Sequence, residues 1–257
     1  LMQRSTMQEA VAAPKMSGIV RLTGFIIRAT ILIELSGAAL LAPVFCRDFG
    51  PVRGLWMALF HSISAFCNAG IDLMGIRIPF SSLTLYAANP LVNLVIMALI
   101  IIGGIGFLTW EDIRSNQLHF GRYRMQSKVI LTTTAILILF PALYFYFGEF
   151  RQGGFGTRVL LSLFQSVTPR TAGFNTADFS QLSASGQMLT IILMLIGGSP
   201  GSTAGGMKTT TAAVVICYII NTLTGKPDCN IYKRRIADAT VKKACVIVCV
   251  NLLIGLI

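Results

Sequence analysis

The chain has 257 residues, of which 54% are apolar and only 12% are charged, and its mean hydropathy is +0.72. Soluble globular domains carry charge on about a quarter of their residues, so this composition excludes an ordinary soluble fold. The formal net charge of +11 is divided among separated loops, whereas a nucleic-acid-binding surface gathers its basic residues on one face.

Several apolar windows have the length of roughly 20 residues that a helix needs to cross a bilayer. The chain begins with residues 1–18, which contain no apolar core of a signal peptide. The apolar windows follow at residues 19–44, 86–108, 126–147, 186–222 (interrupted) and 240–257. The sequence therefore predicts an all-α membrane protein that crosses the bilayer several times.

Basic residues are distributed unevenly between the two sides of the predicted membrane. If the spans alternate around two re-entrant returns, residues 1–21, 109–128 and 223–243 share one side. That side holds thirteen basic residues: Arg4, Lys15, Arg21, Arg114, Arg122, Arg124, Lys128, Lys226, Lys233, Arg234, Arg235, Lys242 and Lys243. The opposite side holds six: Arg47, Arg53, Arg77, Arg151, Arg158 and Arg170. Because positively charged loops remain in the cytosol, we expect the first side to be cytosolic.

One sequence pattern occurs twice. FHSISAFCNAGI at 60–71 and FQSVTPRTAGFN at 164–175 share a Phe, a polar residue, Ser, a β-branched residue and a hydroxyl residue, and both reach Ala-Gly. A span, a polar loop and a short amphipathic stretch (54–66 or 155–168) precede each copy, and another span follows. A dozen residues cannot cross a membrane. The predicted repeating unit is therefore span, half-helix, re-entrant loop, span.

A re-entrant loop of this kind is suited to a cation. Non-helical backbone at membrane depth is tolerated where it is buried in protein or lines a watery cavity. Its carbonyl oxygens can replace the hydration shell of an ion, and the C-terminal end of a half-helix carries partial negative charge. Arg170 lies within the second loop, where we expect its side chain to turn back into the protein and hydrogen-bond to carbonyls.

Residues 197–206 interrupt the fourth apolar window with five glycines and Pro200, which disrupt a helix. A phosphate-binding loop is disfavoured, because Met207 separates Gly206 from Lys208. A broken helix that binds an anionic solute in a secondary transporter leaves the duplicated loops unexplained.

The remaining features have simpler interpretations. We expect GGIG at 103–106 to permit close helix packing and Trp110 to lie at the membrane interface. His61 and His119 are far apart, and we expect His61 to be a packing or hydrogen-bonding residue. The six cysteines form no CxxC pair and are expected to be small buried hydrophobes. No catalytic constellation is present, so an enzyme is not predicted.

FHSISAFCNAG, SVTPRTAGFNTAD and GGSPGSTAGGMKTTT resemble, in order, the second filter, third filter and gate segments of the Trk/Ktr/HKT superfamily of potassium and sometimes sodium transporters. The closest resemblance is to the bacterial Ktr- or Trk-type membrane subunit. Members of the superfamily arrange four span–pore loop–span units around one pore. The resemblance implies that 19–110 is the second unit and 126–223 the third, that 111–125 and 224–239 are cytosolic loops, and that 240–257 opens the fourth. We therefore expect this chain to be a fragment of a longer protein, preceded here by a cytosolic lead-in, 1–18.

The resemblance also implies the site residues. Ion contacts would come from the backbone of Asn68, Ala69, Gly70, Thr171, Ala172, Gly173 and Phe174, with potassium held at their carbonyls. The gate would comprise Gly197, Gly198, Ser199, Pro200, Gly201, Ser202, Thr203, Ala204, Gly205 and Gly206, with Lys208 bracing it.

Finally, the resemblance implies a homodimer in the cytoplasmic membrane of a bacterium. A cytosolic ring of nucleotide-binding regulatory subunits would dock on the basic loops 111–128 and 224–243, which are equally suited to be ordinary membrane anchors. Potassium would be the transported ion, sodium a coupling or activating ion, and no covalent cofactor is expected. A non-conducting scaffold or regulatory membrane subunit remains an alternative.

Overall fold

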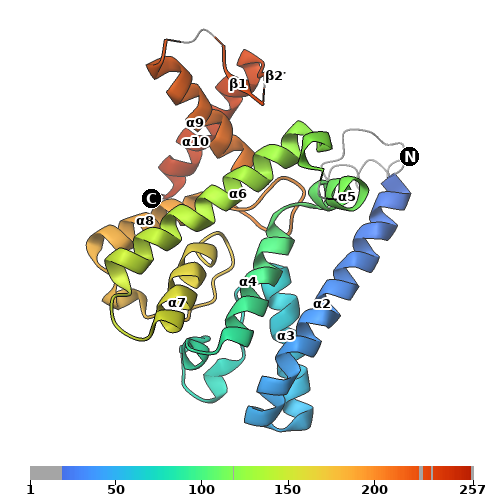
Figure 1. The fold of residues 1–257 in the computed structure, drawn as a ribbon, viewed down its shortest axis with the longest axis vertical. Coiled ribbons are helices and arrows are strands. Elements are labelled where there is room, and N and C mark those ends of the chain that lie inside the picture. The colour runs from blue at the N-terminus through green and yellow to red at the C-terminus, as the bar shows by residue number, and fades with distance from the viewer. Residues whose placement is uncertain (1–18, 118, 226–227, 233, 256–257) are drawn as a thin grey trace.

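The computed structural model describes residues 19–117, 119–225, 228–232 and 234–255 (Figure 1), and the predicted lead-in 1–18 lies outside them. The described residues are mainly helical. The helices are α2 (Ile19–Phe49), α3 (Pro51–Phe66), α4 (Pro90–Gly104), α5 (Phe107–Asn116), α6 (Met125–Tyr144), α7 (Phe155–Val167), α8 (Ala184–Leu195), α9 (Thr209–Leu223) and α10 (Asp238–Gly255). A two-stranded antiparallel hairpin, β1 (Asn230–Ile231) and β2 (Arg234–Arg235), pairs Asn230 with Arg235.

Short helical turns occupy the connections. Four are 3₁₀ turns, at Met74–Ile76, Thr84–Tyr86, Phe120–Arg122 and Phe179–Gln181, and a π-helical turn, Phe145–Glu149, continues α6. Within the described residues, Val20–Phe49 and Met125–Glu149 are long and apolar enough to cross a bilayer. These two helices include the predicted windows 19–44 and 126–147. The predicted all-α membrane fold is thereby confirmed.

The first half-helix follows its span almost without a loop. The predicted polar loop is wrong, because α2 continues to Phe49 and only Gly50 separates it from Pro51 at the start of α3. Gly50 has φ +81°, in the left-handed region that glycine adopts freely. A Cβ on Gly54 would lie 2.3 Å from the Cα of Cys46. The absence of a side chain at Gly54 therefore lets α2 and α3 pack backbone to backbone as a tight hairpin (Figure 1).

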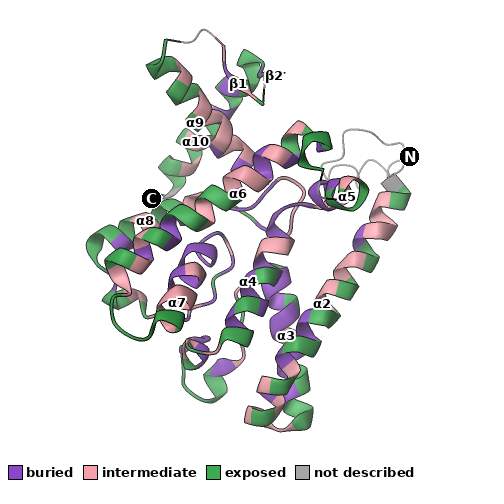
Figure 2. Cartoon of the chain, viewed as in Figure 1, coloured by how far each residue is buried: buried purple, intermediate pink, exposed green. Residues whose placement is uncertain are grey.

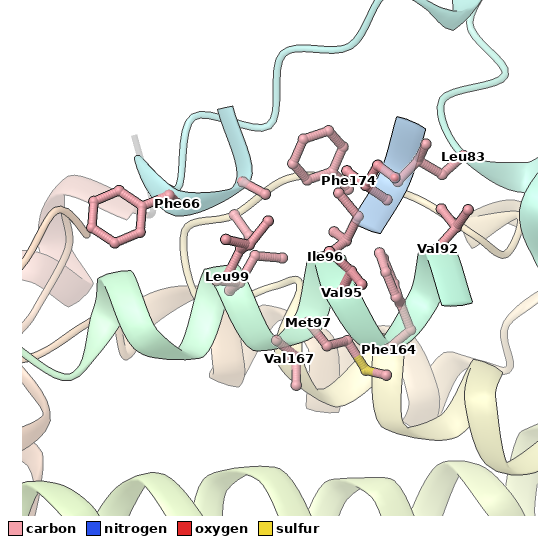
Figure 3. Packing of buried hydrophobic residues seen from close by; sticks show 14 of the residues in the cluster. Phe66, Leu83, Val92, Val95, Ile96, Met97, Leu99, Phe164, Val167 and Phe174 are labelled. Atoms are coloured by element: carbon pink, nitrogen blue, oxygen red, sulfur yellow. The ribbon is translucent and has the colours of Figure 1, made fainter. Parts of the chain in front are cut away.

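Helix α4 lies between the two half-helices. Figure 3 shows Phe66 from α3, Phe164 from α7 and Phe174 from the second loop around α4. Ile96 of α4 is fully buried in this cluster. Burying a large apolar side chain contributes about 1.5–3 kcal/mol. The two repeat units are therefore held together by one shared hydrophobic core, which the buried residues in Figure 2 trace.

The predicted span 86–108 is not one straight helix. α4 ends at Gly104, and α5 starts at Phe107 after a bend of 98°. Gly106 has φ +88°, which helical geometry does not allow. Trp110, predicted at the membrane interface, is instead buried; its indole N–H donates to the Ile102 carbonyl at 2.9 Å. That prediction was wrong because the bend folds α5 back onto the core.

The second unit presents an exposed apolar face. The interrupted window 186–222 consists of α8 and α9, joined by residues 196–208. Met188, Ile191 and Met194 of α8 are exposed, and the exposed face of α8 is visible in Figure 2. An apolar face of this kind is suited to lipid or to another protein element. Helix α10 covers 238–255 of the last window, and residues 256–257 lie outside the described residues.

Candidate ion pathway

The first loop is formed where the half-helix α3 ends. Asn68 and Gly70 have positive φ, +53° and +65°. The N–H of Ala69 donates to the Ser64 carbonyl at 2.9 Å. The Ser64 hydroxyl donates to the carbonyl of Ile71, the residue after the glycine, at 2.7 Å. The last turn of α3 therefore fastens both ends of the loop.

The second loop repeats this geometry at the end of α7. Thr171 and Gly173 have positive φ, +75° and +89°. The carbonyl of Thr168 accepts hydrogen bonds from Ala172 N–H at 3.1 Å and Gly173 N–H at 3.2 Å. The Thr168 hydroxyl donates to the carbonyl of Phe174, again the residue after the glycine, at 2.5 Å. Ser64 and Thr168 occupy the same position in the repeat and hold the same carbonyl.

In both loops, two residues with positive φ flank an alanine, Ala69 or Ala172, whose φ is not positive. A β-branched residue with positive φ, such as Thr171, is a conformational outlier. Such strain costs on the order of 1–3 kcal/mol and collects at functional sites. The loop conformation is therefore maintained against the preference of the side chain.

The two loops lie directly against each other. A Cβ on Gly70 would fall 2.1 Å from the Ala172 carbonyl oxygen and 2.8 Å from the Cα of Gly173. A hollow of about 570 Å³ opens beside this contact, lined by Ala69, Ala172 and Gly173 among others. The seven residues predicted to contact the ion are thus brought together from positions about a hundred residues apart.

Hydrogen bonds fix the segments behind the loops. The buried His61 bonds through Nδ1 to the Met57 carbonyl at 2.7 Å, and its Nε2 accepts from the N–H of Leu73 at 3.3 Å. The ring is therefore neutral, with its proton on Nδ1, which confirms its prediction as a hydrogen-bonding residue. In the second unit, the N–H of Leu83 donates to the Asn175 carbonyl at 2.9 Å, so the outer connection of the first unit holds the second loop.

Arg170 does not make the hydrogen bonds expected of it. Its side chain is buried, and among the described residues its Nε has no hydrogen-bond partner. The neighbouring Thr171 Oγ1 is also buried without a partner there. Unpaired buried polar groups are costly. On this side, the second loop has buried polar atoms that lack hydrogen-bond partners within the part of the chain that the structure describes.

Residues 196–208 form a compact loop whose two ends are joined by backbone hydrogen bonds, here called its neck. The N–H of Gly197 donates to the Met207 carbonyl at 2.9 Å, and the N–H of Gly198 donates to the Gly205 carbonyl at 3.3 Å. The Lys208 ammonium donates to the Ala204 carbonyl at 2.9 Å. Lys208 therefore bonds within this loop.

The bend between α4 and α5 receives this loop. The N–H of Ser199 donates to the Gly104 carbonyl at 2.9 Å, and the N–H of Thr203 donates to the Gly103 carbonyl at 3.2 Å. In return, the N–H of Phe107 donates to the Gly201 carbonyl at 2.8 Å. The broken helix and the glycine-rich loop satisfy each other's backbone groups, as irregular backbone at membrane depth requires. GGIG at 103–106, expected only to permit close helix packing, thus also binds the glycine-rich loop, a role that its sequence pattern does not indicate.

The same loop approaches both half-helix loops. A Cβ on Gly206 would lie 3.5 Å from Thr171 Cγ2. Thr203 bonds to Phe66 and Asn68 at the end of α3. The residues predicted as a gate therefore form one body next to the residues predicted as a filter.

Two span–half-helix–loop units, meeting at their loops beside a glycine-rich break, define a membrane protein with a pore-like architecture. Residues 1–257 match the model of the TrkH family, described as cation transport protein. The chain belongs to this family, which confirms the resemblance to the Trk/Ktr superfamily.

Named relatives support the assignment. The chain is 37% identical over 246 residues to the potassium/sodium uptake protein NtpJ of Enterococcus hirae, covering 94% of this chain and 53% of that protein. It is 35% identical over 250 residues to the Ktr system potassium uptake protein B of Bacillus subtilis, covering 95% and 55%. Both are transporters rather than enzymes, in agreement with the sequence analysis.

A solved structure shares the fold. The potassium transporter TrkH from Vibrio parahaemolyticus aligns with a TM-score of 0.72 at 16% identity, covering 95% of this chain and 53% of that one. The chain spans about half the length of the curated relatives it matches.

Proposed function

We propose that this chain forms part of a pore that takes up potassium across the cytoplasmic membrane of a bacterium. The observation that carries the proposal is the pair of loops with the same alternating backbone, each at the C-terminal end of a half-helix, meeting at Gly70 and Ala172. The names of the relatives support potassium as the substrate, with sodium as a second or coupling ion.

In this proposal, the carbonyls of Asn68, Ala69 and Gly70 and of Thr171 through Phe174 replace the water around a dehydrated potassium ion. The negative ends of α3 and α7 add a favourable potential. Rigid carbonyl positions distinguish ions, and the hydroxyls of Ser64 and Thr168 supply part of that rigidity by holding the carbonyl beyond each glycine.

Residues 197–206 act as the gate in this proposal. The loop is held by hydrogen bonds to the α4–α5 bend and by its own neck, and Lys208 ties its end to Ala204. A gate needs two arrangements of similar free energy. A small set of exchangeable hydrogen bonds, rather than a large apolar interface, suits that requirement.

We also propose a homodimer and a cytosolic ring of nucleotide-binding regulatory subunits, docked on the basic loops 111–128 and 224–243. In support, the two loops approach each other, since the Phe120 and Tyr232 rings lie 6.3 Å apart. The buried Asp112 carboxylate orders the basic loop 111–128 by accepting hydrogen bonds from Ser127 Oγ at 2.6 Å and from the N–H of Arg124 at 3.1 Å. A single partner could therefore contact both loops.

The proposal is tested by rubidium uptake into liposomes that contain the protein expressed from its whole reading frame, with potassium and sodium as competitors. Potassium should inhibit the uptake far better than sodium. Gly173→Ser should lower flux or selectivity, because Gly173 has φ +89° in the second loop. Gly153→Ser is the matched control, since Gly153 also has positive φ, +101°, but lies in the connection before α7 with open space around it.

Deletion of residues 199–205 should raise flux by removing the gate. Unchanged conductance would exclude this gate assignment. A folded protein that passes no rubidium in the presence of its regulatory partner would contradict the pore itself and favour the scaffold alternative. Wild-type selectivity in Gly173→Ser would refute the filter assignment.

A further inference from the structure

We propose that Thr203 and Asn68 form a latch that couples the position of the gate to the geometry of the first filter loop. The inference rests on the proposed function and adds a regulatory contact to it. The latch joins residues 135 positions apart in the chain.

Thr203 is the point of the gate loop that touches the first half-helix. Its hydroxyl donates to the carbonyl of Phe66, the last residue of α3, at 2.8 Å, and accepts from Asn68 Nδ2 at 3.0 Å. Its backbone N–H donates to the Gly103 carbonyl at 3.2 Å. One gate residue thus joins the end of the half-helix, a filter residue and α4.

The orientation of the Asn68 amide follows from its partners. Nδ2 also donates to the carbonyls of Phe66 at 3.3 Å and Ile100 at 3.4 Å. Carbonyls only accept, and the proton of the Thr203 hydroxyl is directed to Phe66, so all three partners require the amide NH₂. The side chain of Asn68 is therefore engaged by the gate and by α4, while its backbone belongs to the filter loop.

Space at this junction is very limited. A Cβ on Gly103 would lie 2.0 Å from the Phe66 carbonyl oxygen, 2.8 Å from Thr203 Oγ1 and 3.1 Å from Asn68 Nδ2. Gly103 is therefore the position at which α4 leaves room for the latch. This contact accounts for a glycine that helix formation alone disfavours.

The latch acts on a strained part of the backbone. Asn68 has φ +53°, a conformation that Asn adopts more readily than most residues but that still needs support. When the gate loop moves away, Asn68 loses an acceptor and the Phe66 carbonyl loses a donor. The left-handed backbone of the filter loop then loses part of its support, so opening the gate loosens the filter.

Coupling between two sites is reciprocal. Potassium bound by the carbonyls of the first loop stabilises the backbone that presents Asn68 to Thr203, and therefore favours the latched gate. Sodium, which fits the loop less well, has a weaker effect. Among the described residues, hydrogen bonds join the gate loop to the end of α3 and to Asn68, and none joins it to residues 171–174, so the coupling runs through the first loop.

The test replaces Thr203 by valine, which keeps the shape and removes the hydroxyl. We expect rubidium flux to rise about five-fold and the preference for potassium over sodium to fall by a similar factor. A change of about five-fold corresponds to the net free energy of one typical hydrogen bond. Thr203→Ser should retain wild-type behaviour. Thr132→Val is the matched control, because it makes the same exchange in α6, where the Thr132 hydroxyl donates to the carbonyls of Lys128 and Val129, outside the filter and the gate.

Hydrogen exchange gives a second measurement that does not need flux. Potassium should slow the exchange of the Ala69 and Thr203 amides in the wild type and in Thr132→Val, but much less in Thr203→Val. If valine prevents folding, Thr203→Ala removes the hydroxyl without adding bulk and carries the same expectations.

The outcomes separate the latch from the proposed function. If the wild type passes no rubidium, the pore proposal fails, and the exchange comparison still decides whether the latch exists. If the wild type conducts and Thr203→Val behaves as Thr132→Val, the latch is overturned while the pore stands. A rise in flux with unchanged ion preference and unchanged exchange at Ala69 also overturns it, since Thr203 would then only hold the gate closed.

Discussion

The two loops proposed to form the filter have the same backbone and different surroundings. Each places a positive φ on either side of an alanine, and each uses a hydroxyl in the last helical turn to hold the carbonyl after the glycine. In the first loop the amide NH₂ of Asn68 has hydrogen-bond partners, whereas the second loop contains Arg170 and Thr171 with buried polar atoms that find no partner among the described residues. Carbonyl presentation depends on the shared backbone, and the side chains differ because each loop faces different neighbours.

The largest expected effect is a difference in flux between alanine variants of the two loop glycines, Gly70 and Gly173. Gly70→Ala should abolish flux, because its Cβ would collide with the Ala172 carbonyl at 2.1 Å, whereas a Cβ on Gly173 meets only the Cα of Gly70 at 3.4 Å. Gly173→Ala should therefore show mainly the conformational cost of positive φ, about 1–2 kcal/mol, with flux reduced about ten-fold. Rubidium uptake by both variants measures the difference. Equal losses would mean that the two loops do not meet as the structure shows.

The hydroxyls of Ser64 and Thr168, which hold the two loops, should also differ in their contribution to the free energy of unfolding. Thr168→Val leaves the carbonyl of the fully buried Phe174 without its donor, which costs about 1–3 kcal/mol. Ser64→Ala frees the carbonyl of Ile71, an exposed residue, where water can replace the donor, so the cost should stay below about 1 kcal/mol. Unfolding in detergent measures both, with Thr168→Ser as the control that retains the hydroxyl. A larger loss for Ser64→Ala would contradict this ranking.

His61→Gln makes the first unit resemble the second, which has Gln165 at the equivalent position. His61 joins α3 to the segment after the filter by bonding to Met57 and Leu73, and a glutamine side chain should retain only one of these bonds. The expected loss is about 1 kcal/mol of unfolding free energy. His61→Leu, which loses both bonds, should cost more. Equal stability of the three proteins would show that this connection does not support the first loop.

The smallest effect concerns the outer connection after the second loop. Hydrogen bonds from the Ser180 hydroxyl and N–H hold the pKa of the Asp178 carboxyl below its ordinary value. A carboxyl whose pKa is lowered on folding contributes stability that is present above the unfolded pKa, about 3.9, and is lost as the pH falls through the lower folded value. Exchange of the Ser180 amide should therefore be faster below that pH than its intrinsic pH dependence predicts. Asp178→Asn should remove this extra acceleration of amide exchange at low pH. If the acceleration persists in the variant, another titrating group causes it.

Some structure follows from local pattern alone. Long apolar windows predicted α2 and α6, and the repeated twelve-residue pattern predicted half-helices that the structure shows as α3 and α7. The hydroxyl at the same place in both copies was visible in the repeat, although its role in holding a carbonyl was not. The helices could be predicted because helix length and hydrophobic periodicity depend on residues that are neighbours in the sequence.

Other features depend on residues far apart. The bend at Gly104–Gly106 depends on backbone hydrogen bonds from the gate loop, which follows much later in the chain. Trp110 matches a membrane-interface residue by composition, but the bend places it beside Phe66, with ring centroids 5.7 Å apart. No local window contains both partners of these contacts.

By itself, the sequence determined an all-α membrane protein with two re-entrant units and a glycine-rich break, because bilayer thickness and hydrophobic length limit what such segments can form. Only the tertiary structure decided that the two loops meet, that the glycine-rich loop proposed as the gate occupies the α4–α5 bend, and that Thr203 reaches Asn68. These contacts satisfy backbone groups that helix breaks leave unpaired, and the partner for each group is chosen by packing rather than by its neighbours in the chain.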